Sequence, residues 1–129
     1  MRRILTALAA SAMFAGAVYA QTAETTETFI VAKPTDVLSS NLIDLDITNS
    51  TNENIGEIKD LVLADGQLTG LIISVGDFLG LDKRYVVVNP AAVKVTYVEN
   101  DNKWTAMMDA TKEQLKAAPE FKYEGRWKR

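Results

Sequence analysis

Alternation of apolar and polar residues over short segments constrains the fold of this sequence more than any other feature. In the first such segment, Leu45 and Ile47 stand on either side of one acidic residue. This period of two is that of a β-strand with one buried face. Turn-forming residues separate the segments. Six strands are predicted, over residues 44–48, 55–63, 67–75, 86–88, 93–97 and 104–108. Short strands with short connections predict a mainly β domain, either an antiparallel meander or a small barrel.

Two local signals refine the second and third strands. The dipeptide Asp65-Gly66 is a strong signal for the tight turn of a β-hairpin. Within the second strand, the apolar residues change parity between Ile58 and Leu61. Such a change predicts a β-bulge near Lys59-Asp60, a feature that bends a sheet towards a barrel.

Two helical segments are predicted at the ends of the β-rich region. The sequence Thr111-Lys112-Glu113-Gln114 matches a capping box, and Pro119 ends the short C-terminal helix that follows. Phe121 is then expected to pack back on the domain. Before the first strand, residues 37–42 predict one helical turn, with Thr35 or Asp36 as its cap.

An export signal is predicted at the N-terminus. Arg2 and Arg3 precede an apolar run from Ile4 to Val18, and the small residues of Val18-Tyr19-Ala20 suit cleavage by a signal peptidase. As a helix the run would cover about 22 Å, too little for a hydrocarbon layer of roughly 30 Å. We therefore expect residues 1–20 to be a cleaved signal peptide and the protein to be periplasmic.

The rest of the chain is expected to divide into three parts. Residues 21–34 begin with QTAETTET, which cannot bury enough apolar surface to offset its ordering entropy and predicts a flexible leader. Residues 35–122 are expected to form the folded domain, and residues 123–129 a basic and aromatic tail. Because the sequence has no cysteine, packing and backbone pairing must stabilise the domain without disulfides.

Missing residue types argue against most catalytic chemistry. The sequence has no histidine and no cysteine, which removes the usual neutral-pH base, the thiolate nucleophile and the common ligands of zinc and haem. Its serines therefore lack an activating imidazole. Asp46 and Glu57 fall at the first and twelfth positions of a calcium-loop pattern, but Thr51 replaces the turn glycine. We predict a protein that is not an enzyme and has no metal site and no cofactor.

Three stretches together resemble the PRC-barrel family. They are residues 57–63, the Asp65-Gly66 turn and residues 75–81. The closest likeness is to exported single-domain members from alphaproteobacteria, whose tails resemble residues 111–121. The resemblance implies a small antiparallel PRC-type β-barrel of about six strands with a short C-terminal α-helix. It also implies a protein-docking or adaptor module, or a self-associating one, without shared catalytic residues, although a fold alone is a weak warrant for function.

The loop Gly76-Asp77-Phe78-Leu79-Gly80 is the first candidate site. Its glycines permit a sharp reversal, and between them stand two large apolar side chains. One hypothesis makes Phe78 and Leu79 a docking contact for an unknown envelope protein or a second copy. The alternative is that both side chains fold over and plug the end of the barrel. A barrel mouth lined by aromatic and acidic side chains could instead bind a small ligand or a cation.

The C-terminal tail is the second candidate site. Arg126, Trp127, Lys128 and Arg129 combine cations with an aromatic ring, a composition that suits an anionic membrane surface or an acidic envelope partner. A solvated tail without a partner is the alternative. Nucleic acid is not expected, because the chain is exported and carries a net charge of −3, whereas phosphate binding depends on a positive surface.

Overall fold

The computed structural model describes residues 27–80 and 82–129. Two compact units divide the chain, Met1–Pro34 and Thr35–Arg129. The predicted signal peptide lies outside the described residues, as does residue 81, and only residues 27–34 of the predicted leader are described. No helix within the described ranges is long and apolar enough to cross a membrane.

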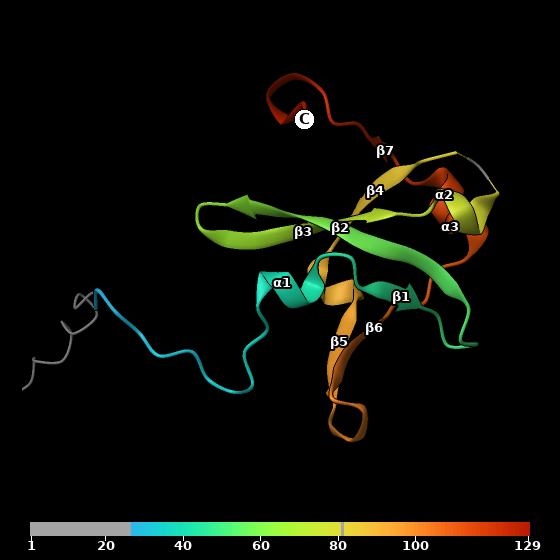
Figure 1. Cartoon of the computed structure of the whole chain (residues 1–129). Coiled ribbons are helices and arrows are strands. Elements are labelled where there is room, and N and C mark those ends of the chain that lie inside the picture. The colour runs from blue at the N-terminus through green and yellow to red at the C-terminus, as the bar shows by residue number, and fades with distance from the viewer. Residues whose placement is uncertain (1–26, 81) are drawn as a thin grey trace, which may run out of the picture. The chain divides into compact units, whose positions relative to one another are not determined.

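The second unit is mainly β, as predicted, and Figure 1 labels its strands and helices. Each predicted strand has a counterpart whose ends differ by a few residues. The strands are β1 (Asp46–Thr48), β2 (Asn54–Ala64), β3 (Gln67–Ser74), β4 (Tyr85–Val88), β5 (Lys94–Val98), β6 (Lys103–Met107) and β7 (Glu120–Phe121). The helices are α1 (Ser39–Leu42), α2 (Gly76–Leu79) and α3 (Lys112–Ala117), with 3-10 turns η2 (Pro90–Ala92), η3 (Glu99–Asp101) and η4 (Gly125–Trp127).

The strands form one mixed sheet rather than the antiparallel barrel that was expected. Its order is β5-β6-β1-β2-β3-β4-β7, and β1 pairs with β6 in parallel. β5 and β7 are the two edges of this sheet, so closure into a barrel is not confirmed. Figure 1 shows that the β2–β3 and β5–β6 hairpins run in different directions, so the sheet is strongly bent. The parallel pair escaped prediction because alternation reveals a strand but not the direction of its partner.

The β-bulge in β2 was predicted correctly and sorts side chains between the two faces of the sheet. Ile58 pairs with Ile73, but the next paired residue is Asp60, opposite Ile72. The register shift leaves Lys59 without a partner in β3 and returns Leu61 to the face of Ile58. Both residues therefore contribute to the core, and the carboxylate of Asp60 is placed on the other face.

The hydrophobic core covers one side of the sheet, here called the inner face. Strands β1, β2 and β3 contribute Ile47, Ile58 and Ile73, which are all 0% exposed. Leu42 of α1 and Leu115 of α3 pack in the same cluster. We call the opposite side the outer face. Neighbouring residues of a strand point to opposite faces, so Ile72 lies on the outer face together with its cross-strand partner Val87.

The two predicted helices had different outcomes. The C-terminal helix is confirmed as α3, and its capping box is complete, since the side chains of Thr111 and Gln114 each accept a hydrogen bond from the other's backbone N–H. The prediction for residues 37–42 was wrong about the cap. α1 begins at Ser39, and Asn41 Oδ1 accepts a hydrogen bond from the Leu38 N–H at 3.2 Å. An amide inside the first turn replaces the expected upstream cap.

Candidate docking surfaces

The predicted loop at residues 76–80 is a short helix rather than an extended loop tip. α2 ends at Gly80, whose φ of 73° is the left-handed conformation typical after a helix. Leu79 is 8% exposed and belongs to the core cluster, whereas Phe78 is partly buried against that cluster. The Lys112 ammonium lies 5.2 Å from the centre of the Phe78 ring. Leu79 is therefore an anchor of the helix, and Phe78 is the large apolar side chain left partly accessible.

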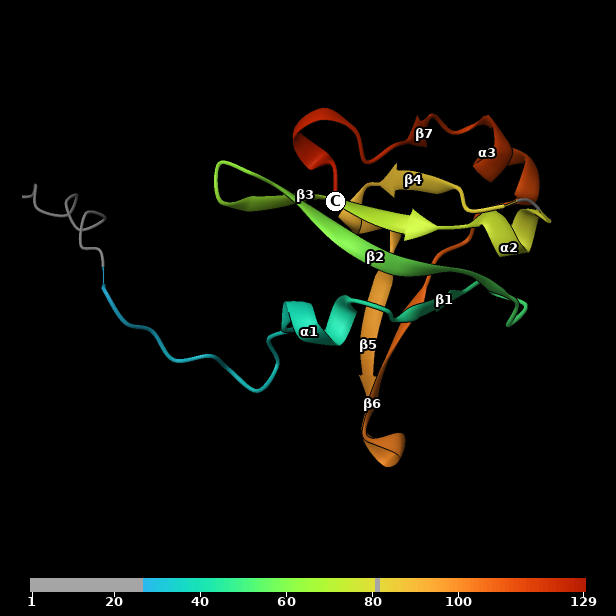
Figure 2. The ribbon, with the colours of Figure 1, turned by 45° about the horizontal axis from the view of Figure 1, so that its top comes forward.

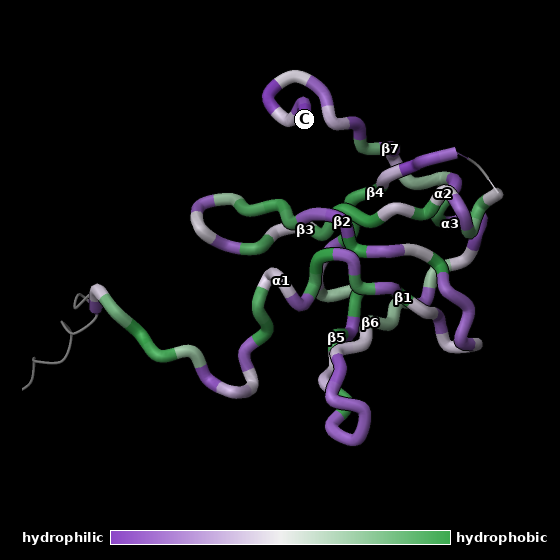
Figure 3. Tube along the Cα trace, viewed as in Figure 1, coloured by the Kyte–Doolittle hydropathy of each residue, from purple (hydrophilic) through white to green (hydrophobic). Residues whose placement is uncertain are grey.

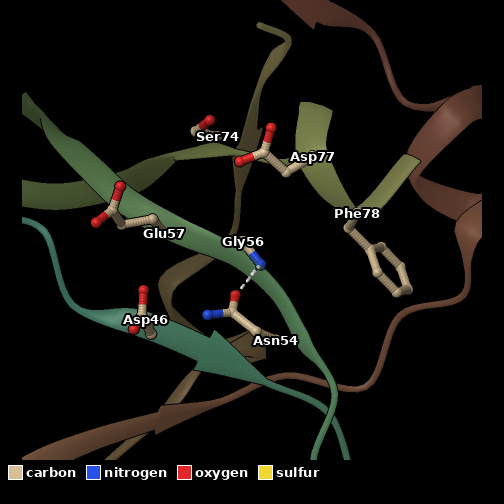
Figure 4. Close-up of a pocket in the computed structure, with 7 residues that line it drawn as sticks. All are labelled: Asp46, Asn54, Gly56, Glu57, Ser74, Asp77 and Phe78. Atoms are coloured by element: carbon tan, nitrogen blue, oxygen red, sulfur yellow. Dashed lines mark hydrogen bonds between the residues drawn. The ribbon is translucent and has the colours of Figure 1, made fainter. Parts of the chain in front are cut away.

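An acidic pocket of about 440 Å³ lies beside α2. Figure 4 shows carboxylates of β1, β2 and α2 around it. Asp46 and Glu57 face each other as a cross-strand pair, and the Glu57 carboxylate is held by Lys59 Nζ at 3.1 Å. The residues that line the pocket are Asp46, Asn54, Gly56, Glu57, Ser74, Asp77 and Phe78.

The lining of this acidic pocket is poorly suited to hold a metal ion. The Asn54 side-chain oxygen accepts a hydrogen bond from the Gly56 N–H at 3.1 Å, drawn as a dashed line in Figure 4. One of the oxygen atoms that line the pocket is therefore already engaged in a hydrogen bond within the protein. Among the residues that the structure describes, no group of three or more acidic side chains is arranged to hold a metal ion.

The C-terminal segment builds a second pocket, on the outer face of the sheet. Figure 2 shows this segment passing beside β3 and β4 after β7. It forms a groove of about 370 Å³, here called the outer groove. The groove is lined by Asp60, Leu61, Val62, Leu63, Ile72, Phe121, Tyr123, Arg126, Trp127, Lys128 and Arg129. All four tail residues singled out in the sequence therefore lie in one wall of the groove.

An aromatic cluster holds this segment in place. The ring of Tyr123 meets those of Tyr85 and Phe121 edge to face, at centroid distances of 5.3 and 5.0 Å. Trp127 packs on Phe121 at 5.4 Å. Such ring pairs stabilise beyond the apolar area that they bury. Ile72 lines the same groove and is 3% exposed, although it does not belong to the main core cluster.

A partly buried hydrogen bond joins the aromatic cluster to the bulge of β2. The Tyr123 hydroxyl donates to Asp60 Oδ2 at 3.1 Å. Burial, followed by the hydrogen bond to Asp60, raises the pKa of the Tyr123 phenol above its ordinary value of 10.0. The guanidinium of Arg129 lies 4.1 Å from the centre of the same ring. The bulge thus supplies the acceptor that positions the tail.

Apolar side chains beyond the aromatic cluster are left uncovered. Leu63, Leu68 and Val87 are 65%, 41% and 45% exposed. A second register shift in β2, between Val62 and Leu63, pairs Leu63 with Leu68, and this shift was not predicted. Gly70 lies between Val62 and Val87, where a Cβ atom would approach a methyl of Val87 to 2.7 Å. Figure 3 shows hydrophobic stretches along this hairpin.

The outer groove was missed at the level of sequence because its parts are distant in the chain. Only the tail was recognised, as four residues with a suitable composition. The floor comes from β2 and β3, some sixty residues earlier. One signal was present in the run 121–127, whose aromatic residues recur every two to four positions. In the structure these rings pack on one another and on Tyr85.

Comparison with known proteins identifies the family. The family model for the PRC-barrel domain matches residues 34–115, more than half of the chain. The chain therefore belongs to the PRC-barrel domain family, in agreement with the resemblance seen in its sequence. No curated protein matches it. The match ends before β7, so the tail wall of the outer groove lies outside the matched residues.

Proposed function

We propose that this chain is a non-enzymatic periplasmic docking module that binds an envelope protein or a second copy of itself through its outer face. Membership of the PRC-barrel family supplies a small β scaffold. The absence of histidine and cysteine from the sequence leaves neither an imidazole base nor a thiolate nucleophile. The surface is therefore where this protein acts.

A single observation carries the proposal, namely that large apolar side chains are uncovered side by side on the β2–β3 hairpin, next to the outer groove. Leu63 and Leu68 form a cross-strand pair, and they are 65% and 41% exposed. Single exposed apolar residues are ordinary on protein surfaces, but a contiguous patch beside a groove is typical of an interaction site. The Trp127 side chain, 63% exposed at the same groove, extends the patch.

Affinity capture from the cell envelope tests this function. The variant Leu63→Ser/Leu68→Ser is expected to lose most of its bound partner, because it removes the apolar contact. It should unfold at the same denaturant concentration as the parent chain, since both side chains are exposed. The matched control is Met107→Ser, which changes a side chain of similar exposure, 42%, on β6. Equal capture by the parent and the double variant would contradict the proposal.

The α2 region is a secondary contact in this proposal, through Phe78 alone. Gly76, Asp77 and Gly80 shape the short helix, and Leu79 holds it to the core. The variant Phe78→Ser separates this contact from the outer face. A drop in capture at least as large as that of Leu63→Ser/Leu68→Ser would move the primary site to α2.

A second candidate function is the binding of a small cationic ligand in the acidic pocket. Its support is the convergence of Asp46, Glu57 and Asp77 beside the ring of Phe78. Calorimetric titration with calcium and with a polyamine checks this candidate. Binding that weakens in Asp77→Asn but not in Asp101→Asn, an exposed carboxylate in η3, would support it. If neither ligand gives a heat of binding, this second candidate function is contradicted.

A further inference from the structure

Two complementary surfaces of this chain are uncovered, the outer groove and the apolar part of the leader. We propose that the outer groove binds the leader of a second copy of this chain, which enters with Phe29, Ile30 and Val31. This inference rests on the proposed docking function and names the second copy as its partner.

The groove offers an apolar floor of suitable size. Val62, Leu63 and Ile72 lie along one side, and the Trp127 ring lies in the other wall. A volume of about 370 Å³ accommodates a few side chains rather than a folded domain. Leu63 and Trp127 are the most exposed of these residues, at 65% and 63%. Covering them would remove apolar surface from water, which is the main favourable contribution to association.

Cations without ionic partners surround this floor. Arg126, Lys128 and Arg129 all line the groove. In the part of the chain that the structure describes, none of these three side chains forms a salt bridge. The three groove cations are therefore available to an anionic partner, in a chain whose net charge is −3. An occupant with carboxylates next to apolar side chains fits this surface best.

The leader has the composition that such a groove requires. Phe29, Ile30 and Val31 are 87%, 82% and 87% exposed, and Figure 3 shows the hydrophobic stretch that they form. Three consecutive large apolar residues at such exposure are unusual on a soluble surface unless they serve a function. Glu24 and Glu27 precede them in the sequence. The leader thus places acidic residues directly before apolar ones.

The connection to the folded unit favours a second copy over the same chain. Residues 32–38 join the apolar residues of the leader to α1, whose Leu42 is buried on the inner face. An extended chain advances at most about 3.5 Å per residue. A leader that bound the groove of its own chain would be limited by the length of this connection. A leader from a second copy has no such restraint, and a mutual exchange of two leaders closes a symmetric dimer.

Analytical ultracentrifugation of the purified exported chain over a range of concentrations tests the inference. The parent chain should form dimers. The leader variant Phe29→Ser/Ile30→Ser/Val31→Ser and the groove variant Arg126→Glu/Lys128→Glu should each raise the dimer Kd by about tenfold or more, as expected when anchor residues of an interface are removed. The matched control Lys94→Glu/Lys103→Glu reverses two exposed cations of β5 and β6 and should dimerise like the parent.

Mixing the two defective variants distinguishes the proposed exchange of leaders from non-specific association. The leader variant retains an intact groove, and the groove variant retains an intact leader, so the mixture should contain heterodimers that neither variant forms alone. A parent chain that stays monomeric at every concentration would overturn the inference, as would a leader variant that dimerises normally. If the parent chain is monomeric and the variant Leu63→Ser/Leu68→Ser still loses capture from the envelope, the second copy is rejected as the partner. The docking function itself is then supported.

Anionic vesicles supply the remaining comparison, because cations beside an exposed Trp127 also suit a lipid surface. The expected result is weak vesicle binding that leaves the dimer Kd unchanged. Tight binding of a monomeric chain to vesicles containing phosphatidylglycerol, lost in Arg126→Glu/Lys128→Glu, would contradict the inference and assign the groove to the membrane.

Discussion

At the scale of single residues, Gly76 shows how closely the α2 region is fitted to the core. A Cβ atom on Gly76 would collide with the backbone carbonyl oxygen of Asp82. A backbone atom cannot move aside as a flexible side chain can, so Gly76→Ala must displace α2. Gly80 differs, because its φ is 73° but a Cβ atom there would meet nothing within 4 Å. The two glycines are therefore required for different reasons, one steric and one conformational.

These two reasons predict an order of stability. Gly76→Ala should lower the free energy of unfolding by about 2 kcal/mol or more, as overpacking does. Gly80→Ala should lower it by about 1 kcal/mol, the cost of a left-handed conformation for a residue with a Cβ atom. Denaturant unfolding of both variants measures these differences. An alanine at residue 76 that is tolerated better than one at residue 80 would contradict the packing described for α2.

The raised pKa of Tyr123 predicts that the folded chain loses stability at alkaline pH. Its pKa is raised in the folded state, so the folded chain holds the phenolic proton more tightly than the unfolded chain does. The contribution of Tyr123 is therefore complete below its unfolded pKa of about 10 and is lost as the pH rises through the higher folded value. Between about pH 9 and 11, the parent chain should lose more stability than Tyr123→Phe, whose ring cannot ionise.

Measurement of the unfolding free energy across this pH range checks the prediction. In both proteins Lys59 also lowers the free energy of unfolding as the pH rises, because its hydrogen bonds to Asp44 and Glu57 raise its pKa above 10.5. The informative quantity is thus the difference between the parent and Tyr123→Phe. A difference that stays constant with pH would mean that Tyr123 does not occupy the buried, hydrogen-bonded position described for it.

At the scale of elements, Arg84 joins α3 and β7 to the rest of the sheet. Its Nη2 donates to the carbonyl oxygens of Ala118 and Lys116 at 2.6 and 3.2 Å, and its Nη1 reaches Glu120 Oε1 at 3.3 Å. The side chain is only 17% exposed. Carbonyl groups at the end of a helix lack partners within the helix, so one guanidinium satisfies the end of α3 and positions the strand that follows.

Replacement of Arg84 by methionine should release this end of the chain. We expect a loss of about 2 kcal/mol, since hydrogen bonds from a charged donor are removed and two carbonyl groups lose their partner. Hydrogen exchange should accelerate at β7 and around Tyr123, and stay unchanged in the β5–β6 hairpin. Acceleration throughout the domain would instead show that the segment is not an independently opening element.

Prediction from sequence succeeded for elements whose signals are local. The parity change between Ile58 and Leu61 revealed the bulge, and Asp65-Gly66 revealed its hairpin turn, in which both residues have positive φ. The capping box of α3 is equally local. The parallel pairing of β1 with β6 and the two-residue strand β7 were missed, because each depends on a partner that is distant in the chain.

At the scale of the whole molecule, the candidate site was only partly predictable. From the sequence, Phe78, Leu79 and the tail were candidate contacts, with burial of both loop side chains as the alternative, but the structure assigns Leu79 to the core and the tail to a wall of the outer groove. The floor of that groove depends on the face of β3 on which Ile72 lies. Leu71, Ile72 and Ile73 are consecutive apolar residues, and such a run gives no sign of which face each side chain occupies.

The proposed function of this molecule depends on the apolar hairpin and the outer groove as its contact surface. Photocrosslinking in living cells that export the chain tests this most directly, with the photoreactive residue at position 68 and, as a control, at position 96 of β5. We predict a discrete crosslinked species in the envelope fraction from position 68 and none from position 96. An absence of crosslinks from position 68, or the same products from both positions, would contradict the account.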